Sequence, residues 1–271
     1  MALSNYQFAF NGVTIGVGGT YPIVVDAVDG LGGTSPLRIQ DDNRGYIDGS
    51  YSGRDFYSGR TVTLDLLVLG DSSHSAQYYY KALQDAWYPQ QNAWYQDPTS
   101  TTNRANEVQL FQYQLTSDTG TKRLYGRFRG FTQMVITPDY AFGYIQVRAE
   151  FYFPDPRYYD DTALSIASGT TATLSNAGWA YSCPVITIAS TTNTNGTITD
   201  GNTVMSFANM TTGQNLTIDL LQRIVYYNGN PARNIMTSAS NGWLSVAPNT
   251  SSITWTSTVG SMAITARNAY I

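Results

Sequence analysis

The chain has 271 residues, of which 42% are hydrophobic, so it can form one large domain or two of ordinary size. Its formal net charge of −4 argues against general attraction to nucleic acid, because phosphate binding depends on clustered Lys and Arg. The single cysteine, Cys183, excludes a disulfide within the chain and a cysteine-rich metal site, and it fits a reducing cytosol. The start of the chain lacks the pattern of a secretory signal, and no stretch is apolar enough to span a bilayer. We therefore expect no membrane insertion.

Most of the first 160 residues alternate with period two and are rich in Thr, Val, Ile, Tyr and Phe. This pattern predicts half-buried antiparallel strands, most clearly at 61–69, 107–115 and 144–153. The glycine-rich stretch 12–20 (GVTIGVGGT) lacks the Gly-Lys-Ser/Thr of a phosphate-binding loop, and we interpret it as a loop between strands.

One segment, DSSHSAQYYYKALQDAWYP at 71–89, has a different period. Ser72 or Ser73 is predicted to cap a helix here, and Pro89 is predicted to end it. The aromatic face of this helix is expected to pack on a sheet. The apolar residues at helical spacing are Ala76, Tyr79, Tyr80, Leu83 and Trp87.

The stretch EFYFPDPRYYDD, residues 150–161, marks the predicted boundary between two domains. Pro154 and Pro156 interrupt strand pairing, and Tyr158 and Tyr159 are expected to pack at this joint. The region from Asp161 onward holds only three of the 15 basic and three of the 19 acidic residues, so the charge pattern changes at the same place. The predicted domains are residues 1–160 and 161–271.

The second domain contains short strand-like segments among Ser, Thr, Asn and Gly, with no helical segment. Their spacing predicts a β-sandwich whose surface is mostly hydroxyl and amide and poor in anchors for a partner. Asn228-Gly229 is a strong hairpin signal, because a tight type I′ turn requires positive φ. The fold class is thus mainly β, with one helix in the first domain.

The sequence contains only weak patterns of catalytic residues. The only histidine, His74, lies among serines at the start of the predicted helix, where a capping or solvent role is favoured over catalysis. The only glutamates, Glu107 and Glu150, lie on predicted strands without a motif that joins either to an aspartate. We predict no catalytic, cofactor-binding or metal residues, and no enzyme activity.

Arginines and tryptophans are the best candidates for contacts between subunits. Arg127 and Arg129 belong to the one basic cluster, on a strand where Arg123, Tyr125 and Phe131 are expected to share their face. This face could follow a nucleic acid backbone, but the acidic total favours ion pairs with the aspartates of residues 41–48 on the same or a neighbouring subunit. Repeated AWY tripeptides place Trp87 and Trp94 either as exposed anchors or as clamps of the helix end.

Several motifs, in order, are similar to those of the siphophage distal tail protein, a phage minor tail protein. The resemblance covers nearly the whole chain. Its motifs are FAFNGVTIG, VDGLGGTSPLR, DGSYSGRDFYSGRTVTLDL, FPDPRYYDD, NAGWAYSCPVITI, GQNLTIDLLQRIVYYNG and SMAITARNAYI.

This resemblance implies a β-rich belt domain that forms a homo-hexameric ring, followed by a galectin-like β-sandwich that points outward. It implies a virion structural protein at the distal end of the phage tail, made and assembled in the host cytoplasm. The ring would be a hub joining the tail tube protein to the tail-tip or baseplate hub protein. It would surround the channel used by the tape measure protein and then by DNA, without sequence-specific nucleic acid binding.

Two other functions remain open at this point. A lectin-like carbohydrate- or receptor-binding module of a phage adhesion device would explain the sandwich and the tryptophans, but not the charged first domain. A glycoside hydrolase would need two carboxylates in one cleft, for which the sequence offers no motif.

Overall fold

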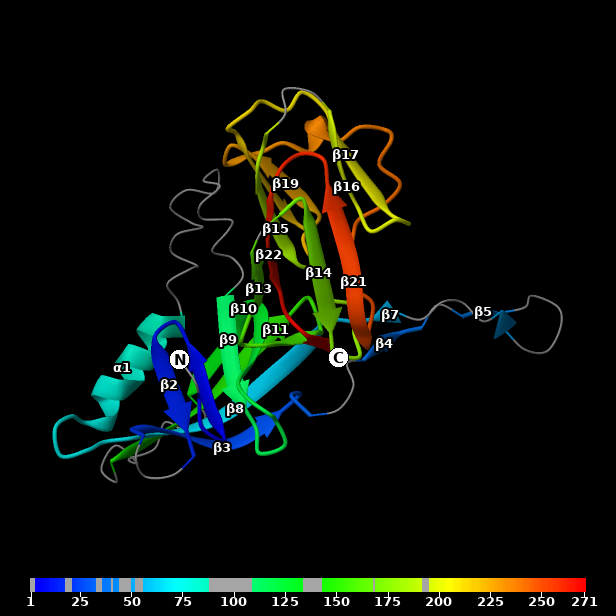
Figure 1. Ribbon diagram of the computed structural model, residues 1–271. Helices are drawn as coiled ribbons and strands as arrows, with labels where there is room; N and C mark the ends of the chain where they lie inside the picture. Colours follow the sequence, from blue (N-terminus) through cyan, green and yellow to red (C-terminus); the bar gives the residue numbers. More distant parts are fainter. Residues whose placement is uncertain are drawn as a thin grey trace. The chain divides into compact units, whose positions relative to one another are not determined.

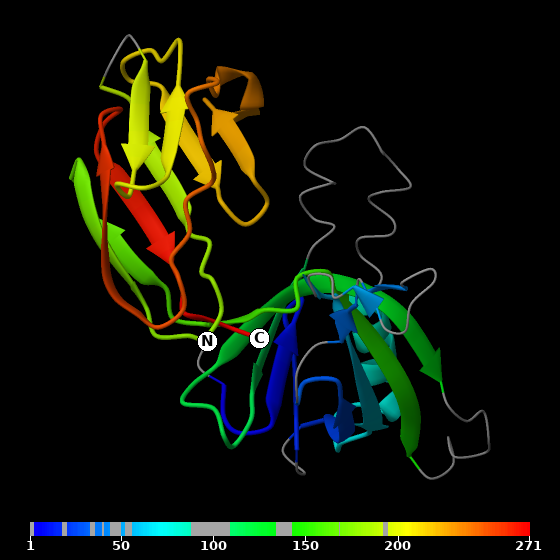
Figure 2. The same cartoon turned by 90° about the vertical axis from the view of Figure 1, so that its right-hand side faces the viewer.

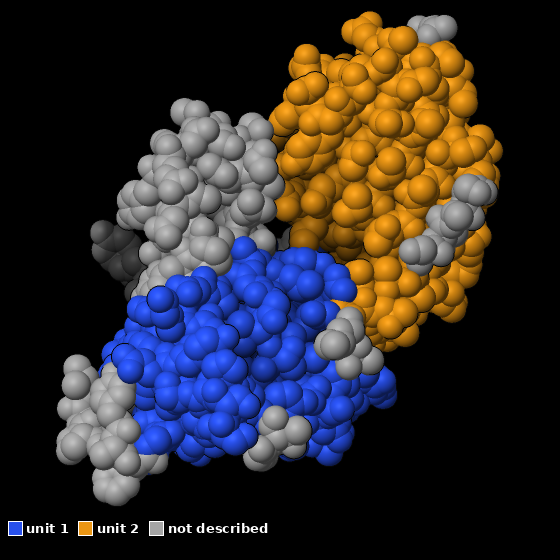
Figure 3. All heavy atoms as spheres, turned by 90° about the vertical axis from the view of Figure 1, so that its left-hand side faces the viewer, with its two compact units in different colours: residues 1–158 blue, residues 159–271 orange. Residues whose placement is uncertain are grey.

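The computed structural model describes residues 3–17, 21–32, 36–39, 41–43, 50–51, 56–87, 109–133, 143–167, 169–191 and 195–271. The fold is mainly β, as predicted (Figure 1). Contacts divide the chain into two compact units, Met1–Tyr158 and Tyr159–Ile271 (Figure 3). The predicted division into separately folding domains at residue 160 stays a prediction.

The first unit is a closed β-barrel. The pairing of β10 with β11 closes the barrel, and in Figure 2 these long green strands curve over the blue strands of the same unit. Alternate residues of β8 (Val62, Leu64, Leu66 and Val68) point inward and are buried, as the period-two pattern predicts. The strands, in spatial order, are β11 (Tyr144–Phe153), β8 (Arg60–Leu69), β3 (Ile23–Asp29), β2 (Val13–Gly16), β1 (Gln7–Phe10), β9 (Gln109–Gln114) and β10 (Lys122–Gln133).

The glycine-rich stretch 12–20 is not simply a loop, because its residues Val13–Gly16 form β2. The strand forms because β1 supplies a full antiparallel partner, from Phe10↔Val13 to Gln7↔Gly16. On its other side β2 pairs in parallel with β3 at one described position, Gly16↔Val24. Backbone pairing between β2 and β3 is therefore short among the described residues, and we call this place the seam.

The helix α1 spans Ala76–Trp87 and packs on the barrel through β8, β10 and β11. It begins later than predicted, because Asp71 and not a serine hydroxyl accepts backbone hydrogen bonds in the preceding turn. Pro89 lies outside the described residues. The predicted face is confirmed: Ala76, Leu83 and Trp87 are buried, and the two tyrosines pack against the same core. Among the described residues, no helix has the length and apolarity needed to cross a membrane.

A two-stranded ribbon extends from the barrel between β3 and β8. Its inner part pairs β4 (Leu37–Arg38) with β7 (Phe56–Tyr57), and its outer part pairs β5 (Asp42–Asn43) with β6 (Ser50–Tyr51). Figure 1 shows this ribbon running away from the barrel strands. We call its described inner part, residues 36–39 and 56–58, the arm.

The second unit consists of two sheets around a core that includes Phe207, Ile218 and Trp255. At the predicted hairpin, Asn228 and Gly229 both have positive φ (51° and 81°), and the flanking Tyr227 and Asn230 pair, which confirms the tight turn. A 3₁₀ turn, Arg233–Ile235, follows. One sheet contains β13 (Leu164–Ala167), β22 (Met262–Ala266), β15 (Val185–Ala189), β18 (Asn215–Asp219), β19 (Ile224–Tyr227) and β20 (Asn230–Pro231), and the other contains β14 (Thr171–Asn176), β21 (Thr250–Ser257), β16 (Gly196–Thr199) and β17 (Val204–Phe207).

The proline stretch lies where the first unit ends. β11 ends at Phe153, immediately before Pro154, and after Pro156 the chain resumes as β12 (Tyr158–Asp160). Tyr158 is half-buried and packs against the barrel core, with its ring centroid 6.4 Å from that of Tyr113. Tyr159 is buried. Their role as a joint between domains stays a prediction.

At the start of the second unit, backbone and side-chain contacts hold β12 to β23 (Ala269–Tyr270). The Arg267 guanidinium donates to the carbonyls of Asp160 and Asp161. Asn268 donates through its amide nitrogen to the Asp160 carboxylate at 2.8 Å. The chain end of this unit is thereby fixed to its beginning.

Candidate functional site

The outer face of β10 carries the arginines that the sequence singles out. Leu124 points into the barrel, whereas Arg127 and Arg129 are exposed. Arg127 lies opposite Tyr152 of β11, and the Arg129 guanidinium carbon is 3.9 Å from the centre of the Tyr152 ring. This distance is that of a close cation–π contact. We call Arg127, Arg129 and Tyr152 the outer arginine face.

The prediction that Phe131 shares this face is wrong. The pairing of β10 with β11 shifts between Phe128 and Phe131, which is the signature of a β-bulge. A bulge adds one residue to one strand, so the alternation of faces reverses beyond it. Phe131 is partly buried, and its ring centroid lies 5.5 Å from that of Trp87 and 5.7 Å from that of Tyr80. The arginines are thus separated from the last aromatic of their strand.

An ion pair extends the charged exterior onto β8. Arg148 donates to both carboxylate oxygens of Asp65, at 2.8 and 2.9 Å, directly across the β11–β8 ladder. The hydrogen bond from Arg148 lowers the pKa of Asp65, and the same bond raises the pKa of Arg148. The pair is solvent-exposed, with side-chain exposures of 50% for Arg148 and 25% for Asp65, so it contributes little to stability. It shows that cross-strand pairing of opposite charges orders this exterior.

Of the two tryptophans of the AWY repeats, the structure describes Trp87. Trp87 is only 2% exposed and lies with its ring centroid 4.6 Å from that of Phe128 and 4.5 Å from that of Phe151. It clamps the end of α1 to the sheet, and the interpretation of Trp87 as an exposed subunit anchor is wrong. Trp94 lies outside the described residues.

Arg60 and Lys122 are the buried cations among the described residues, and Arg60 lies in the barrel wall. Arg60 is 2% exposed, donates to the carbonyl of Leu31 at 3.2 Å and lies 5.9 Å from the Tyr158 ring centre. Burial lowers the pKa of Arg60 and raises the pKa of the neighbouring Tyr113. These groups fix the root of the arm to the end of the barrel.

A cavity of about 370 Å³ opens on the surface at the seam. Here β3 carries a second bulge, because its pairing with β8 shifts between Val25 and Ala27. The intervening Asp26 is exposed and is the only carboxylate among the lining residues. We call this cavity the seam pocket. Its lining consists of Tyr6, Phe8, Val17, Val25, Asp26, Ala27, Val28, Leu31 and Leu115.

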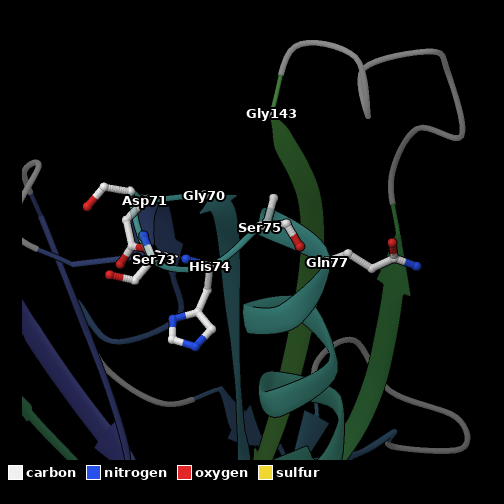
Figure 4. A pocket seen from close by; sticks show the side chains of 9 residues that line it. Gly70, Asp71, Ser73, His74, Ser75, Gln77 and Gly143 are labelled. Carbon is white, nitrogen blue, oxygen red and sulfur yellow. Dashed lines mark hydrogen bonds between the residues drawn. The ribbon is translucent and has the colours of Figure 1, made fainter.

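The turn before α1 is ordered by hydrogen bonds to Asp71. Asp71 accepts hydrogen bonds from the backbone N–H groups of Ser73 and His74, both at 2.7 Å, and from the hydroxyl of Tyr79 at 2.6 Å. These bonds lower the pKa of Asp71, with the tyrosine hydroxyl as the largest cause. The His74 ring stacks on Tyr78 at 4.0 Å and points away from Ser75 and Gln77 (Figure 4). Asp71 and His74 thus order the helix start.

Candidate metal ligands do not come together in the described ranges. No group of three or more His, Cys, Asp or Glu residues that could hold a metal ion occurs there. Glu107 lies outside these ranges, and Glu150 lies on β11, half-buried.

Two exposed aromatic residues of the second unit are not among the residues that the sequence predicts to form contacts. Trp179 and Tyr181 are each 56% exposed. The Trp179 indole N–H donates to the Ile271 carbonyl at 3.1 Å, and its ring meets Tyr270 edge-on at 4.9 Å. The sequence pattern that indicates their exposure is the alternation with the small residue Ala180, which is buried between them. These two residues are an exception on a unit that the sequence predicts to be poor in anchors.

Comparisons with known proteins connect these features to one class of structure. No protein-family model matches the chain, and no curated protein matches it. Among solved structures, the Dit protein (gp 19.1) of phage SPP1, described as a paradigm of the hub adsorption apparatus in phages that infect Gram-positive hosts, matches with a TM-score of 0.64. It is 15% identical, and the match covers 98% of this chain and 99% of that one.

The baseplate of phage P2 matches in two structures. In its activated conformation with Ca, the TM-score is 0.56 at 9% identity, covering 97% of this chain and 98% of that one. With Sr, the TM-score is 0.53 at 9% identity, covering 93% and 97%. The chain therefore has the fold of phage hub and baseplate proteins along nearly its whole length.

Proposed function

We propose that this chain is the distal tail protein of a siphophage, a structural hub at the distal end of the tail. The observation that carries the proposal is the end-to-end likeness to a phage hub protein, which includes both units and leaves almost no residue of either chain unmatched. A shared enzyme or lectin domain alone would match one unit and leave the other unaligned. The sequence motifs point to the same family independently.

In this proposal, residues 1–160 form a homo-hexameric ring, and residues 161–271 form a galectin-like sandwich that points outward. The barrel unit is suited to the ring, because its described exterior offers arginines, one cross-strand ion pair and exposed aromatic residues of the arm. The ring joins the tail tube protein to the tail-tip or baseplate hub protein around the path of the tape measure protein and DNA. A net charge of −4 favours DNA sliding through such a ring without sticking.

The role is structural and not enzymatic. The described residues hold no group of three or more His, Cys, Asp or Glu that could bind a metal ion, and the one histidine stacks on Tyr78 at the start of the helix. The proposal needs no cofactor, since its chemistry consists of contacts between subunits. The protein acts within the virion, after assembly in the host cytoplasm.

Electron microscopy of the purified full-length protein tests the proposal. We expect six-fold rings with a central hole, and on addition of the tail tube protein we expect rings stacked on tube ends. Monodisperse monomers at micromolar concentration, with no ring in the presence of the tube protein, would contradict it. Light scattering on fragments 1–160 and 161–271 tests the division of labour, with an oligomeric first fragment and a monomeric second one expected.

A lectin-like role of the second unit is a second candidate, favoured by the exposed Trp179 and Tyr181. The indole is fixed at its nitrogen by Ile271, so its ring offers a rigid exposed surface, and aromatic rings of this kind serve as binding anchors. A glycan array probed with the full-length protein tests it. Binding that disappears in Trp179→Ala but persists in Trp243→Ala supports the role, whereas no glycan above background refutes it.

A further inference from the structure

The tip of the hairpin between β19 and β20 is exposed and held by few contacts. Asn228 and Gly229 form its two-residue turn, both are exposed with positive φ, and a Cβ on Gly229 would meet nothing within 4 Å. The strand β20 has two residues and ends its sheet, and its Pro231 has no N–H to donate to the ladder. Short edge pairing of this kind opens locally at a low cost in free energy, so the turn is a weak point of the sandwich.

An asparagine that precedes a glycine can react with its own backbone. The backbone nitrogen of Gly229 gives up its proton to water or hydroxide and attacks the side-chain carbonyl carbon, Cγ, of Asn228. A bond forms between these two atoms, the bond from Cγ to the side-chain nitrogen breaks, and ammonia leaves. Water then opens the five-membered imide at either carbonyl, which gives aspartate or isoaspartate. Glycine favours the attack, because it has no side chain to crowd the nitrogen.

Hydrogen bonds distinguish this pair from two of the other three Asn-Gly pairs in the chain. The side chain of Asn11 donates to the Ala86 carbonyl at 2.7 Å. The side chain of Asn241 accepts from a backbone N–H at 2.7 Å and donates to a backbone carbonyl at 3.1 Å. A carboxamide held in this way loses these bonds when it turns toward the next backbone nitrogen. The Asn228 side chain makes no hydrogen bond to any residue that the structure describes, so it turns without such a cost.

The remaining pair, Asn195-Gly196, is constrained at its glycine. Gly196 lies in β16 opposite Phe207, and a Cβ there would lie 2.5 Å from the Val259 side chain. Strand pairing and close packing therefore fix the backbone nitrogen that would attack. Of the four pairs, Asn228-Gly229 alone combines an unbonded side chain with a turn at a weak edge.

We propose that Asn228 is a site of spontaneous deamidation, and that it is the first of the four pairs to react in the folded protein. The reaction needs only water and proceeds when β20 opens, because the closed turn holds the backbone in its positive-φ form. Isoaspartate adds a methylene group to the backbone, and either product adds a negative charge. This modification is independent of the proposed function.

The expected structural result is the release of β20. A two-residue type I′ turn does not fit the longer backbone of isoaspartate, so the pairing of β20 with β19 is lost. The N–H of Ala232, just after β20, donates to the Val225 carbonyl at 2.7 Å in the intact protein. Amide hydrogen exchange at Ala232 should therefore become faster in the converted protein, and unchanged exchange there would refute the release.

Incubation of the folded full-length protein in mildly alkaline buffer tests the site itself. Peptide mapping by mass spectrometry follows each Asn-Gly pair separately, through the mass change when NH2 is replaced by OH. We expect Asn228 to convert at least about fivefold faster than the other three asparagines, because its turn opens most easily. In protein unfolded by urea the four rates should draw together, since every one of these asparagines precedes a glycine.

A pair of matched variants identifies the source of the fast phase. Asn228→Gly removes the reacting side chain and keeps a residue that tolerates positive φ, so the fast formation of isoaspartate should disappear. Asn11→Gly makes the same change in the hairpin between β1 and β2 and should retain the fast phase. The ranking of the four sites uses wild-type protein, so it stands even where a variant fails to fold. Conversion of Asn11 or Asn241 as fast as Asn228 in folded protein overturns the inference, as does an Asn228 that stays intact while the unfolded chain reacts.

Discussion

The barrel and the sandwich are built on the same alternation of buried and exposed residues, but their exteriors differ in chemistry. In β14 of the sandwich, the outward positions are Thr171, Thr173 and Ser175. In β10 of the barrel, they include Arg127 and Arg129, and an apolar arm extends from the same unit. Small hydroxyl side chains keep a sheet face in water with few strong contacts, whereas Arg and large aromatics dominate interfaces.

The two units therefore share the alternation of buried and exposed residues but differ in the chemistry of their outward side chains. The described barrel exterior carries exposed arginines, one cross-strand ion pair and an arm with exposed aromatic residues. Among the described residues of the sandwich, the exposed large aromatics are Trp179 and Tyr181. The predictions below test whether this separation also holds for stability and assembly.

The largest expected effect comes from removing a core aromatic in each unit. Trp255 and Phe151 are both essentially fully buried, in separate cores. Replacement of either by Ala should cost about 3–5 kcal/mol of unfolding free energy, because a large cavity is left behind. Trp255→Ala should lower only the unfolding transition of the sandwich, and Phe151→Ala only that of the barrel. A single transition that shifts equally in both variants would show that the units unfold as one.

A smaller effect is expected at a glycine of β10. A Cβ on Gly126 would lie 2.4 Å from the Phe153 ring and 2.5 Å from the Tyr152 carbonyl oxygen, which is closer than real contacts allow. Gly126→Ala should therefore destabilise the barrel by about 1–3 kcal/mol and disturb the adjacent outer arginine face. Gly120→Ala is the matched control, since its Cβ would meet nothing within 4 Å. Equal urea midpoints for the two variants would contradict the packing argument.

Local patterns explain how much of this could be predicted from the sequence. Period-two alternation located β8 and β11, the helical spacing located the face of α1, and Asn228-Gly229 located a hairpin. Each of these signals lies within a few residues of the chain. Burial then follows automatically, because one face of each element is apolar.

Features set by distant pairing could not be read in the same way. The strand status of 13–16 depends on β1, and the bulge that turns Phe131 inward depends on its register with β11. The seam pocket likewise arises where β2 and β3 cease to pair. A local pattern contains no information on register, so the candidate site was predicted only in part: its arginines, but neither the pocket nor the arm.

The outer arginine face should affect assembly more than stability. Because Arg127 and Arg129 are exposed, removing both side chains should change the unfolding free energy by no more than about 1 kcal/mol. If they pair with carboxylates of a neighbouring subunit, Arg127→Ala with Arg129→Ala should reduce the oligomer at physiological salt. Arg223→Ala with Arg233→Ala removes the same charge from the sandwich and should leave the oligomer intact. An unchanged oligomer in the first double variant, measured by light scattering, would refute the assignment.

The smallest effect concerns the Arg148–Asp65 pair and is specific to acid. The pKa of Asp65 is lowered in the folded state, so its contribution to stability is present above the unfolded carboxyl pKa of about 4 and is lost as pH falls through the folded pKa. Since the pair is exposed, Asp65→Asn should cost below about 1 kcal/mol at pH 7, and wild type and variant should converge once the pH falls below the folded pKa of Asp65. Arg148→Gln and the double variant complete a cycle in which the second change adds little to the first. The measurement is the unfolding free energy at pH 7 from urea curves. If the losses in the two single variants add up to the loss in the double variant, Arg148 and Asp65 contribute no more to stability than two isolated surface charges.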